Sequence, residues 1–156
     1  MSKGFVVAEQ GHVVQLIAPV SISAAATSDV FSMENWAHAT IIVLAGAGSA
    51  TTVTVSECDN FTPSNAATKT FQYAVEATAA GDVLDAALQT GATSGVSTGT
   101  ASGSIMVIEI DNDELSDGYP CVQINLSDPG TSKVVSAVAI LSGARYAEDI
   151  TATVIA

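Results

Sequence analysis

Alternation of apolar and polar residues with a period of two is the feature that most constrains how this chain folds. In Thr51–Glu57, TTVTVSE, Val53 and Val55 face one side and the hydroxyl side chains face the other. In Cys121–Leu126, CVQINL, three aliphatic residues alternate with Gln and Asn in the same way. Successive side chains of a strand point to opposite faces. Both segments are therefore predicted to be half-buried β-strands.

Further segments rich in β-branched residues have the length of strands. They are HVVQLIAPV (12–20), HATIIVLAG (38–46), TKTFQYAV (68–75), SIMVIEI (104–110) and KVVSAVAIL (133–141). Clusters of Gly, Pro, Asn and Asp separate the strands at a spacing of roughly ten residues, which is typical of a sandwich. We expect an all-β fold, a β-sandwich of the jelly-roll or Greek-key kind.

The 156 residues fit one domain, because a chain of this length can bury a core without disulfides or metals. We expect residues 1–156 to form a single β-sandwich. Residues 1–20 could serve as an N-terminal arm that adds a strand to a neighbouring subunit. Residues 89–104, QTGATSGVSTGTASGS, lack charge and aromatic rings and are predicted to form one long flexible loop or a loosely specified ribbon. The best helix candidate is AGDVLDAAL (80–88).

The formal net charge is −12, and only Lys3, Lys69, Lys133 and Arg145 are positive. Contacts with a nucleic-acid backbone need cations, so we expect no nucleic-acid partner. An acidic surface keeps a protein soluble, and it also suits a basic patch on a partner. Both roles stay open at this point.

Neither a signal peptide nor a membrane span is predicted. The opening MSKGFVVAEQGH has a four-residue apolar run that ends before Glu9, which is too short for a signal peptide. Residues 35–56 carry no charge, but they contain Asn, His and Gly, and their second half alternates. We expect synthesis in the cytoplasm and no membrane partner.

Five carboxylates lie within nine residues of one segment, EIDNDELSD (109–117). They are Glu109, Asp111, Asp113, Glu114 and Asp117. A calcium loop of the EF-hand type needs an oxygen ligand at position 5, Gly at position 6 and Glu at position 12. Counted from Asp111, these positions hold Leu115, Ser116 and Val122, so the pattern excludes such a loop.

The same segment fits a corner between two strands. Asp111 would cap a single helical turn, and Glu114, three residues later, would complete a capping box. Leu115 would then enter the core, and Ser116–Gly118 would turn the chain into the next strand. We predict that the cluster is architectural, and whether it also binds a cation stays open.

Other patterns resemble catalytic or ligand-binding motifs but lack their context. Gly95–Gly99, GVSTG, matches the nucleophile-elbow pattern, yet His12 and His38 precede it and no helix pattern follows. Ala45–Ala50, AGAGSA, lacks the lysine and the helix of a phosphate-binding loop. The two Cys and two His are not at the spacing of metal ligands.

Cys58 and Cys121 are too few for a disulfide framework and are expected to be small buried apolar groups. We predict no catalytic residue, no cofactor and no metal, and expect that the chain is not an enzyme. A pair of carboxylates brought together across strands stays open, because sequence spacing does not reveal it.

The apolar content favours assembly with other chains. Hydrophobic residues make up 48% of the chain, and the mean hydropathy is +0.42. The runs ATIIVL and IMVI are apolar on both faces and need more cover than a two-layer sandwich of this size provides. We therefore expect a homo-oligomer with cyclic symmetry.

Two stretches resemble a class of small tailed-phage virion proteins. In SIMVIEIDNDEL and GYPCVQINLSDPGTSKVVSAVAILSGARYA, the shared features are a strand ending in Ile-Asp, a Cys-Val-x-Ile-x-Leu strand and a closing Ala-Arg-Tyr. In VVQLIAPVSI and VFSMENWAHATIIVLAGAGSATTVTV, they are Met33, Trp36 and the Gly-Ala-Gly turn. The likeness covers most of Val13–Ala147 and weakens across residues 89–104.

This resemblance implies a capsid decoration, or cement, protein that docks on an assembled phage head. Such proteins are often β-sandwich trimers at symmetry axes of the capsid. The implied partners are the major capsid protein and further copies of the chain, as a homotrimer. The implied location is the capsid surface of the virion, after synthesis in the host cytoplasm. Weak contacts multiplied by symmetry can hold a swelling shell together.

Six residues are selected as contacts with other subunits or with the shell. They are Phe5, Val6 and Val7 in the arm, Trp36 at an expected sheet edge, and Arg145 and Tyr146 beside the last strand. Alternatives stay open: a carbohydrate- or surface-binding module with a Thr-rich face, and an enzyme whose site forms across strands. Within a virion, a tail-tube or baseplate component would form rings or tubes instead of closed trimers.

Overall fold

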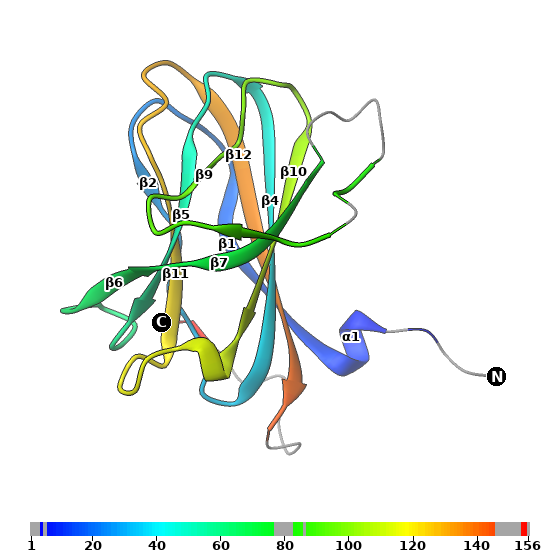
Figure 1. Cartoon of the computed structure of the whole chain (residues 1–156), viewed down its shortest axis with the longest axis vertical. Coiled ribbons are helices and arrows are strands. Elements are labelled where there is room, and N and C mark those ends of the chain that lie inside the picture. Colours follow the sequence, from blue (N-terminus) through cyan, green and yellow to red (C-terminus); the bar gives the residue numbers. More distant parts are fainter. Residues whose placement is uncertain (1–3, 5, 77–82, 86, 146–153, 156) are drawn as a thin grey trace.

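The computed structural model describes residues 4, 6–76, 83–85, 87–145 and 154–155, which form a sandwich of two antiparallel sheets (Figure 1). The elements are α1 (Val7–Gln10), β1 (Gly11–Ile22), β2 (Ala26–Thr27), β3 (Phe31–Ser32), β4 (Trp36–Gly48), β5 (Thr52–Cys58), β6 (Ala66–Lys69), β7 (Phe71–Glu76), β8 (Gln89–Gly91), β9 (Val96–Ser97), β10 (Ser104–Asp111), the 3₁₀ turn η1 (Asn112–Glu114), β11 (Cys121–Leu126) and β12 (Lys133–Ala144). The prediction of an all-β sandwich is confirmed.

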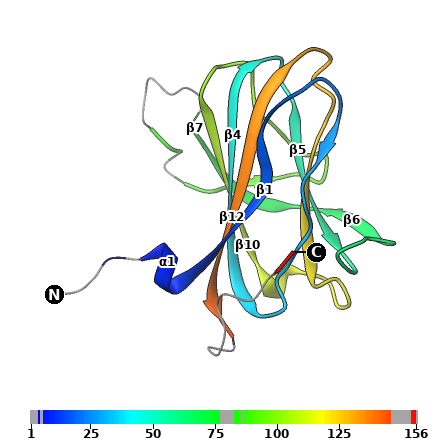
Figure 2. The ribbon, with the colours of Figure 1, turned by 180° about the vertical axis from the view of Figure 1, so that it is seen from behind.

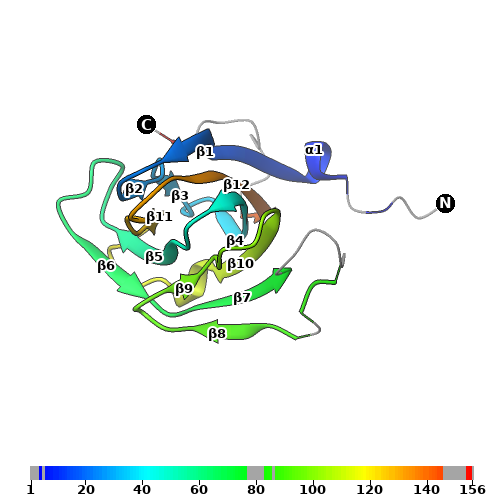
Figure 3. The same cartoon turned by 90° about the horizontal axis from the view of Figure 1, so that it is seen from above.

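Non-consecutive strands are neighbours in both sheets. The larger sheet has the order β1-β12-β4-β10-β7-β8, and the smaller sheet has the order β2-β11-β5-β6, with β3 paired to β11 and β9 to β5. The chain changes sheet eight times: from β1 to β2, β3 to β4, β4 to β5, β6 to β7, β8 to β9, β9 to β10, β10 to β11 and β11 to β12. Crossings of this kind characterise Greek-key sandwiches. Seen from above, β1 and β8 lie at opposite sides of the molecule (Figure 3).

The predicted strands form because their alternation matches the pleat of a sheet. Along β10, buried and half-buried residues alternate without a break, and β4 and β12 behave similarly over most of their length. The inward residues of the two sheets meet in one core, where Phe31, Ile41, Ile108 and Ile124 are fully buried. Burial of each such side chain stabilises the fold by about 1.5–3 kcal/mol.

The two cysteines lie opposite each other, Cys58 on β5 and Cys121 on β11. Both are buried and free. Burial, followed by the neighbouring Cys121, raises the pKa of the Cys58 thiol to about 11. A thiol with a raised pKa is a poor nucleophile at neutral pH, so the prediction of small buried apolar groups is confirmed.

Residues 89–104, predicted to be a long loop or a loosely specified ribbon, are mostly loop and contain two short strands. Two short strands lie in this segment: β8 extends the larger sheet beside β7, and β9 pairs with β5 of the smaller sheet. The fully buried Lys133 donates its Nζ to the backbone oxygen of Gly99 at 3.0 Å, and Ser104 Oγ donates to the oxygen of Thr98 at 3.2 Å. Backbone and hydroxyl hydrogen bonds order a segment that has few apolar side chains.

Two further expectations concern the ends of elements. Residues 11–20 of the expected arm lie in β1, which pairs with β12 of the same chain, so this part belongs to the domain's own sheet. Figure 2 shows α1 at the lower end of β1, projecting to the side of the sheet. The helix candidate 80–88 lies partly outside the described residues, and its described positions 83–85, 87 and 88 are not helical. In the described part of the chain no helix is long and apolar enough to cross a membrane.

Candidate functional site

The outward side of β12, β4 and β10 forms a continuous surface, which we call the outer face. Its side chains are Val134, Ser136, Val138, Ile140 and Ser142 from β12, His38, Thr40, Ile42 and Leu44 from β4, and Ile105, Val107, Glu109 and Asp111 from β10. Strand β4 lies between the other two, so every outward residue of β4 has a cross-strand neighbour on each side. Pairing thus places residues more than 60 positions apart in sequence on one surface.

Aliphatic side chains occupy the middle of the outer face. The register places Ile42 between Val107 and Val138, and Leu44 beside Ile105. We call these five residues the aliphatic centre. Leu44 is 44% exposed, and the other four are half-buried. A contiguous apolar surface of this kind is characteristic of sites that contact another molecule.

An apolar groove lies at the upper end of the outer face, where β4 ends and β12 begins. Pro19, Leu44, Gly46, Ile105 and Val134 line this shallow groove, which has a volume of about 270 Å³. Val134 packs against Gly46, where an added Cβ would come within 3.1 Å of the Val134 Cβ. Glycine therefore lets the β12 backbone approach β4 and leaves the groove open to solvent.

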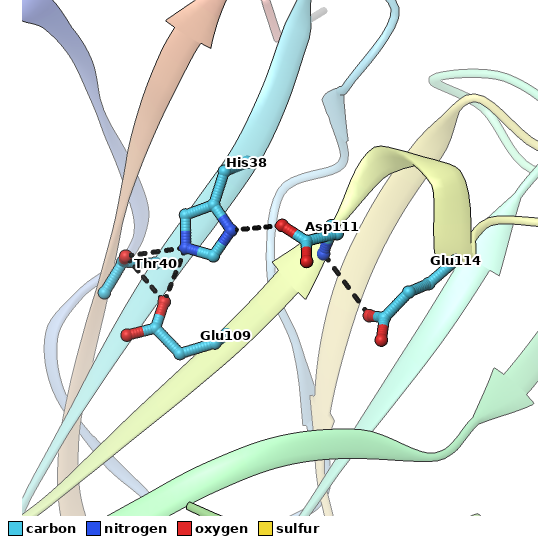
Figure 4. Close-up of polar contacts among 5 residues, drawn as sticks. All are labelled: His38, Thr40, Glu109, Asp111 and Glu114. Atoms are coloured by element: carbon cyan, nitrogen blue, oxygen red, sulfur yellow. Dashed lines mark hydrogen bonds and ion pairs between the residues drawn. The ribbon is translucent and has the colours of Figure 1, made fainter.

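A polar cluster lies at the other end of the outer face (Figure 4). His38 Nδ1 is 2.6 Å from Asp111 Oδ1, and His38 Nε2 is 2.8 Å from Glu109 Oε2. Thr40 Oγ1 donates to the same Glu109 oxygen at 2.7 Å. The antiparallel register creates this contact, because Asp111 is the cross-strand partner of His38 and Glu109 is that of Thr40.

The two carboxylates favour the protonated form of His38. Burial alone lowers the pKa of His38, but the hydrogen bonds and charges of Asp111 and Glu109 outweigh it, so the pKa is raised above 6.5. An imidazole donates from both ring nitrogens only as an imidazolium, which is the form that both contacts require. The cluster is therefore a histidine clamped between two carboxylates on neighbouring strands.

The corner after β10 is built as the sequence predicts. Asp111 and Glu114 form a capping box around η1, and the Asp111 backbone N–H donates to Glu114 Oε2 at 3.3 Å (Figure 4). Leu115 packs against the core, and Gly118 adopts a φ of 84° in the turn before β11. Asp111, Glu114 and Leu115 of the acidic segment therefore have structural roles.

The His38 cluster was not predicted from the sequence. No motif in the sequence selects His38, and the capping-box interpretation of the acidic segment involves no partner on another strand. The alternation does place His38 and Thr40 on one face of β4, but their position opposite Asp111 and Glu109 depends on the register with β10. Within the described ranges no group of three His, Cys, Asp or Glu is arranged to hold a metal ion.

The predicted contact residues are spread over several sites. Phe5 and Tyr146 lie outside the described residues, and Val6 and Val7 are half-buried at the start of α1. Trp36 is only 3% exposed and packs in the domain's own core, so its side chain is not part of the outer surface.

Arg145 is exposed just after β12. Its backbone N–H donates to the Asn35 oxygen at 2.9 Å. With the Asn112 amide oxygen turned toward it, the guanidinium Nη2 donates at 2.7 Å. Arg145 thus ties the end of β12 to the acidic corner.

The Gly95–Gly99 pattern lies far from both histidines. Ser97 belongs to β9, pairs with Thr52, and accepts a hydrogen bond from the Gly99 N–H at 3.1 Å. Gly99 contacts Lys133 at the start of β12, whereas His12 pairs with Leu141 and His38 with Ser142, both near its end. Neither histidine is placed to act as a base for Ser97.

Comparison with known proteins identified one similar solved structure. No protein-family model matches the chain, and no curated protein matches it. The crystal structure of the SPBc2 prophage-derived protein YomS is similar, with a TM-score of 0.48 and 11% sequence identity, over 83% of this chain and 94% of that chain.

Proposed function

We propose that the chain is a structural, non-catalytic protein of a tailed-phage virion, which binds the outside of the assembled head and stabilises the capsid as a homotrimer. The observation that carries this proposal is the aliphatic centre on the outer face, in which Leu44 is exposed and the other four side chains are half-buried. A contiguous aliphatic surface that is open to water is unfavourable and is characteristic of a surface that another protein covers. The sequence resemblance to capsid decoration proteins points in the same direction.

The charge of the chain suits this role. A net charge of −12 repels the packaged DNA and keeps the free protein soluble in the host cytoplasm before it reaches the capsid surface. The proposed partner is the major capsid protein, which a shell presents in many symmetric copies. A trimer that engages several copies gains affinity from multivalency, so each single contact can be weak.

The test uses expanded empty heads of the phage whose genome encodes this chain. Purified protein is mixed with these heads and sedimented, and the bound amount is measured against the free concentration. We expect saturable binding with a stoichiometry that matches symmetry-related sites. Unexpanded heads and heads of an unrelated phage serve as controls. Absence of saturable binding to the expanded heads contradicts the proposal.

A second candidate function has one observation in its favour. The smaller sheet carries a shallow groove of about 480 Å³ on its outward side, and six of its nine lining residues carry a hydroxyl or amide side chain. They include Thr27, Thr52, Thr54, Asn125 and Ser127. Groups of this kind can form hydrogen bonds with sugar hydroxyls. Glycan-array binding that Asn125→Ala abolishes would favour a carbohydrate-binding module, and a blank array would count against it.

A further inference from the structure

We propose that the outer face docks on a protein surface that is apolar at its centre and bordered by Lys or Arg. This inference deepens the proposed function, on which it rests for the identity of the partner as the shell protein. Two features of the face carry the proposal: the aliphatic centre, and the acidic residues that border it.

The aliphatic centre supplies the apolar contact. Ile42, Val107 and Val138 form one row across three strands, and Leu44 and Ile105 form the next row toward the groove. None of these five side chains is ionisable, so a partner can cover them without desolvating a charge. The rows lie on regular antiparallel strands, which hold the surface rigid and reduce the entropy lost on binding.

Carboxylates border this centre on two sides, and we call them the acidic rim. Glu109 and Asp111 follow Val107 along β10, with side chains that are 26% and 59% exposed. Glu76 of β7 is the cross-strand partner of Ile105, on the same side of the sheet. An apolar centre with a charged border is the usual anatomy of a protein interface, and acids at the border favour cations on the partner.

A second copy of this chain is a poor match for the acidic rim. Lys69 Nζ is paired with Glu57 Oε2 at 3.0 Å on the smaller sheet, and Lys133 is fully buried. Among the cations in the described ranges, this leaves Arg145, which is exposed beside Asp111 at the acidic end of the face, and protonated His38, which is already paired with Glu109 and Asp111. Contact between two acidic ends would bring like charges together, which disfavours self-association through this face. Charge complementarity therefore favours a different, basic-bordered protein.

The area of the outer face is small, which agrees with a contact that binds strongly only when several copies form together. Three strands at about 4.8 Å spacing and about eight residues at 3.4 Å rise cover roughly 400 Å². Two such surfaces bury about 800 Å² in total, which is below the area of a typical stable interface. A single contact of this size is weak, whereas several contacts of one oligomer on a symmetric shell are strong together.

The experiment compares variants of the face with a matched control. Ile42→Asp places a charge in the aliphatic centre, and Leu44→Ser is a milder change at an exposed side chain in case Ile42→Asp does not fold. Val83→Asp is the control, because Val83 is 72% exposed and is not part of the outer face. The double variant Glu76→Gln with Asp111→Asn removes charge from the rim. Circular dichroism and thermal melting verify that each variant is folded.

Two readouts separate this inference from the proposed function. The first is binding to the expanded heads. The second uses two 18-residue amphipathic helical peptides as probes, one of Leu and Lys and one of Leu and Glu, titrated against the isotope-labelled protein by NMR. We expect the Leu/Lys peptide to bind at least tenfold tighter and to perturb the amides of β4 and β10. We expect Ile42→Asp or Leu44→Ser to weaken both kinds of binding at least tenfold, the rim variant to weaken the Leu/Lys peptide, and Val83→Asp to match the wild type.

Each contrary outcome has a defined meaning. If the wild type binds heads and the Ile42→Asp and Leu44→Ser variants bind equally well, the inference is wrong and the proposed function stands. If the wild type does not bind heads but binds the Leu/Lys peptide at this face, the inference stands and the proposed function fails. Equal binding of the two peptides overturns the inference. So does a dimer that Ile42→Asp dissociates in sedimentation equilibrium, because a second copy would then cover the face.

Discussion

At the scale of single residues, His38 is the side chain whose state depends most on its neighbours. It lies between Asp111 on one ring nitrogen and Glu109 on the other, and all three side chains are partly exposed. Solvent screening keeps such pairs weak, at about 0.2–1 kcal/mol. The cluster therefore orients the side chains at one end of the outer face and contributes little to the overall stability of the protein.

The raised pKa of His38 makes this contribution depend on pH with a defined sign. The pKa of His38 is higher in the folded protein than in the unfolded chain, where it is near 6.5. The stability that this shift adds is fully present below pH 6.5 and is lost as the pH rises through the pKa of the folded state. We expect the free energy of unfolding of the wild type to be about 0.2–1 kcal/mol higher than that of His38→Gln at pH 5.5, with a smaller difference at pH 9. Urea unfolding of both proteins at several pH values measures the difference.

The variant Glu109→Gln provides the control for this prediction. With one carboxylate removed, the change in unfolding free energy caused by His38→Gln should depend less on pH than it does in the wild type. If the effect of His38→Gln in the wild type stays constant from pH 5.5 to 9, the assignment of His38 as a clamped imidazolium is contradicted.

At the scale of elements, the glycines around β9 have unequal roles. Gly95 has a φ of 88°, and an added Cβ would lie 2.5 Å from the Val53 backbone oxygen. Gly99 has a φ of 67°, with no atom within 4 Å of an added Cβ. Both positions favour glycine because of the left-handed backbone, but only Gly95 also lies against a neighbouring strand.

This difference predicts unequal effects of substitution by alanine. Gly99→Ala should cost about 1–2 kcal/mol, the penalty of a left-handed alanine. Gly95→Ala should cost more, because the clash with β5 requires a backbone shift or separates β9 from the sheet. Chemical denaturation of both variants measures the two costs. Equal losses would mean that β9 does not pack on β5 as the structure describes.

The positions of the strands were largely predictable from the sequence, whereas the pairing of each strand with its neighbours in the sheet was not. CVQINL is β11 to the residue, and SIMVIEI is β10 without its last residue, because alternation reports directly on the pleat. The pairing of residues 89–104 was missed, since Gly, Ser and Thr give no hydrophobic pattern there. The His38 cluster was missed because register between β4 and β10 is set by long-range packing.

At the scale of the whole molecule, the outer face explains the high apolar content of a small domain. The runs ATIIVL and IMVI were predicted to be apolar on both faces, and in the fold one side of each enters the core and the other forms the aliphatic centre. The sequence could therefore indicate that extra apolar surface exists. It could not say which side of which sheet carries it, because that depends on the order of the strands.

The proposed homotrimer is tested by the mass of the free protein. A trimer of 15.7-kDa chains has a mass of about 47 kDa. Light scattering coupled to size exclusion at micromolar concentration should give this value. The Ile42→Asp variant should give the same mass, because the outer face is proposed to be free for another partner. A monodisperse monomer would contradict the trimer, and rings or tubes would favour a tail component.

The proposed function places the outer face against the shell of a phage head. Cryo-electron microscopy of expanded heads incubated with saturating protein tests this directly. We predict extra density at symmetry axes of the shell, with the β4 and β10 surface turned toward capsid residues that include Lys or Arg. Heads without extra density, or bound protein with β4 and β10 facing solvent, would contradict the account.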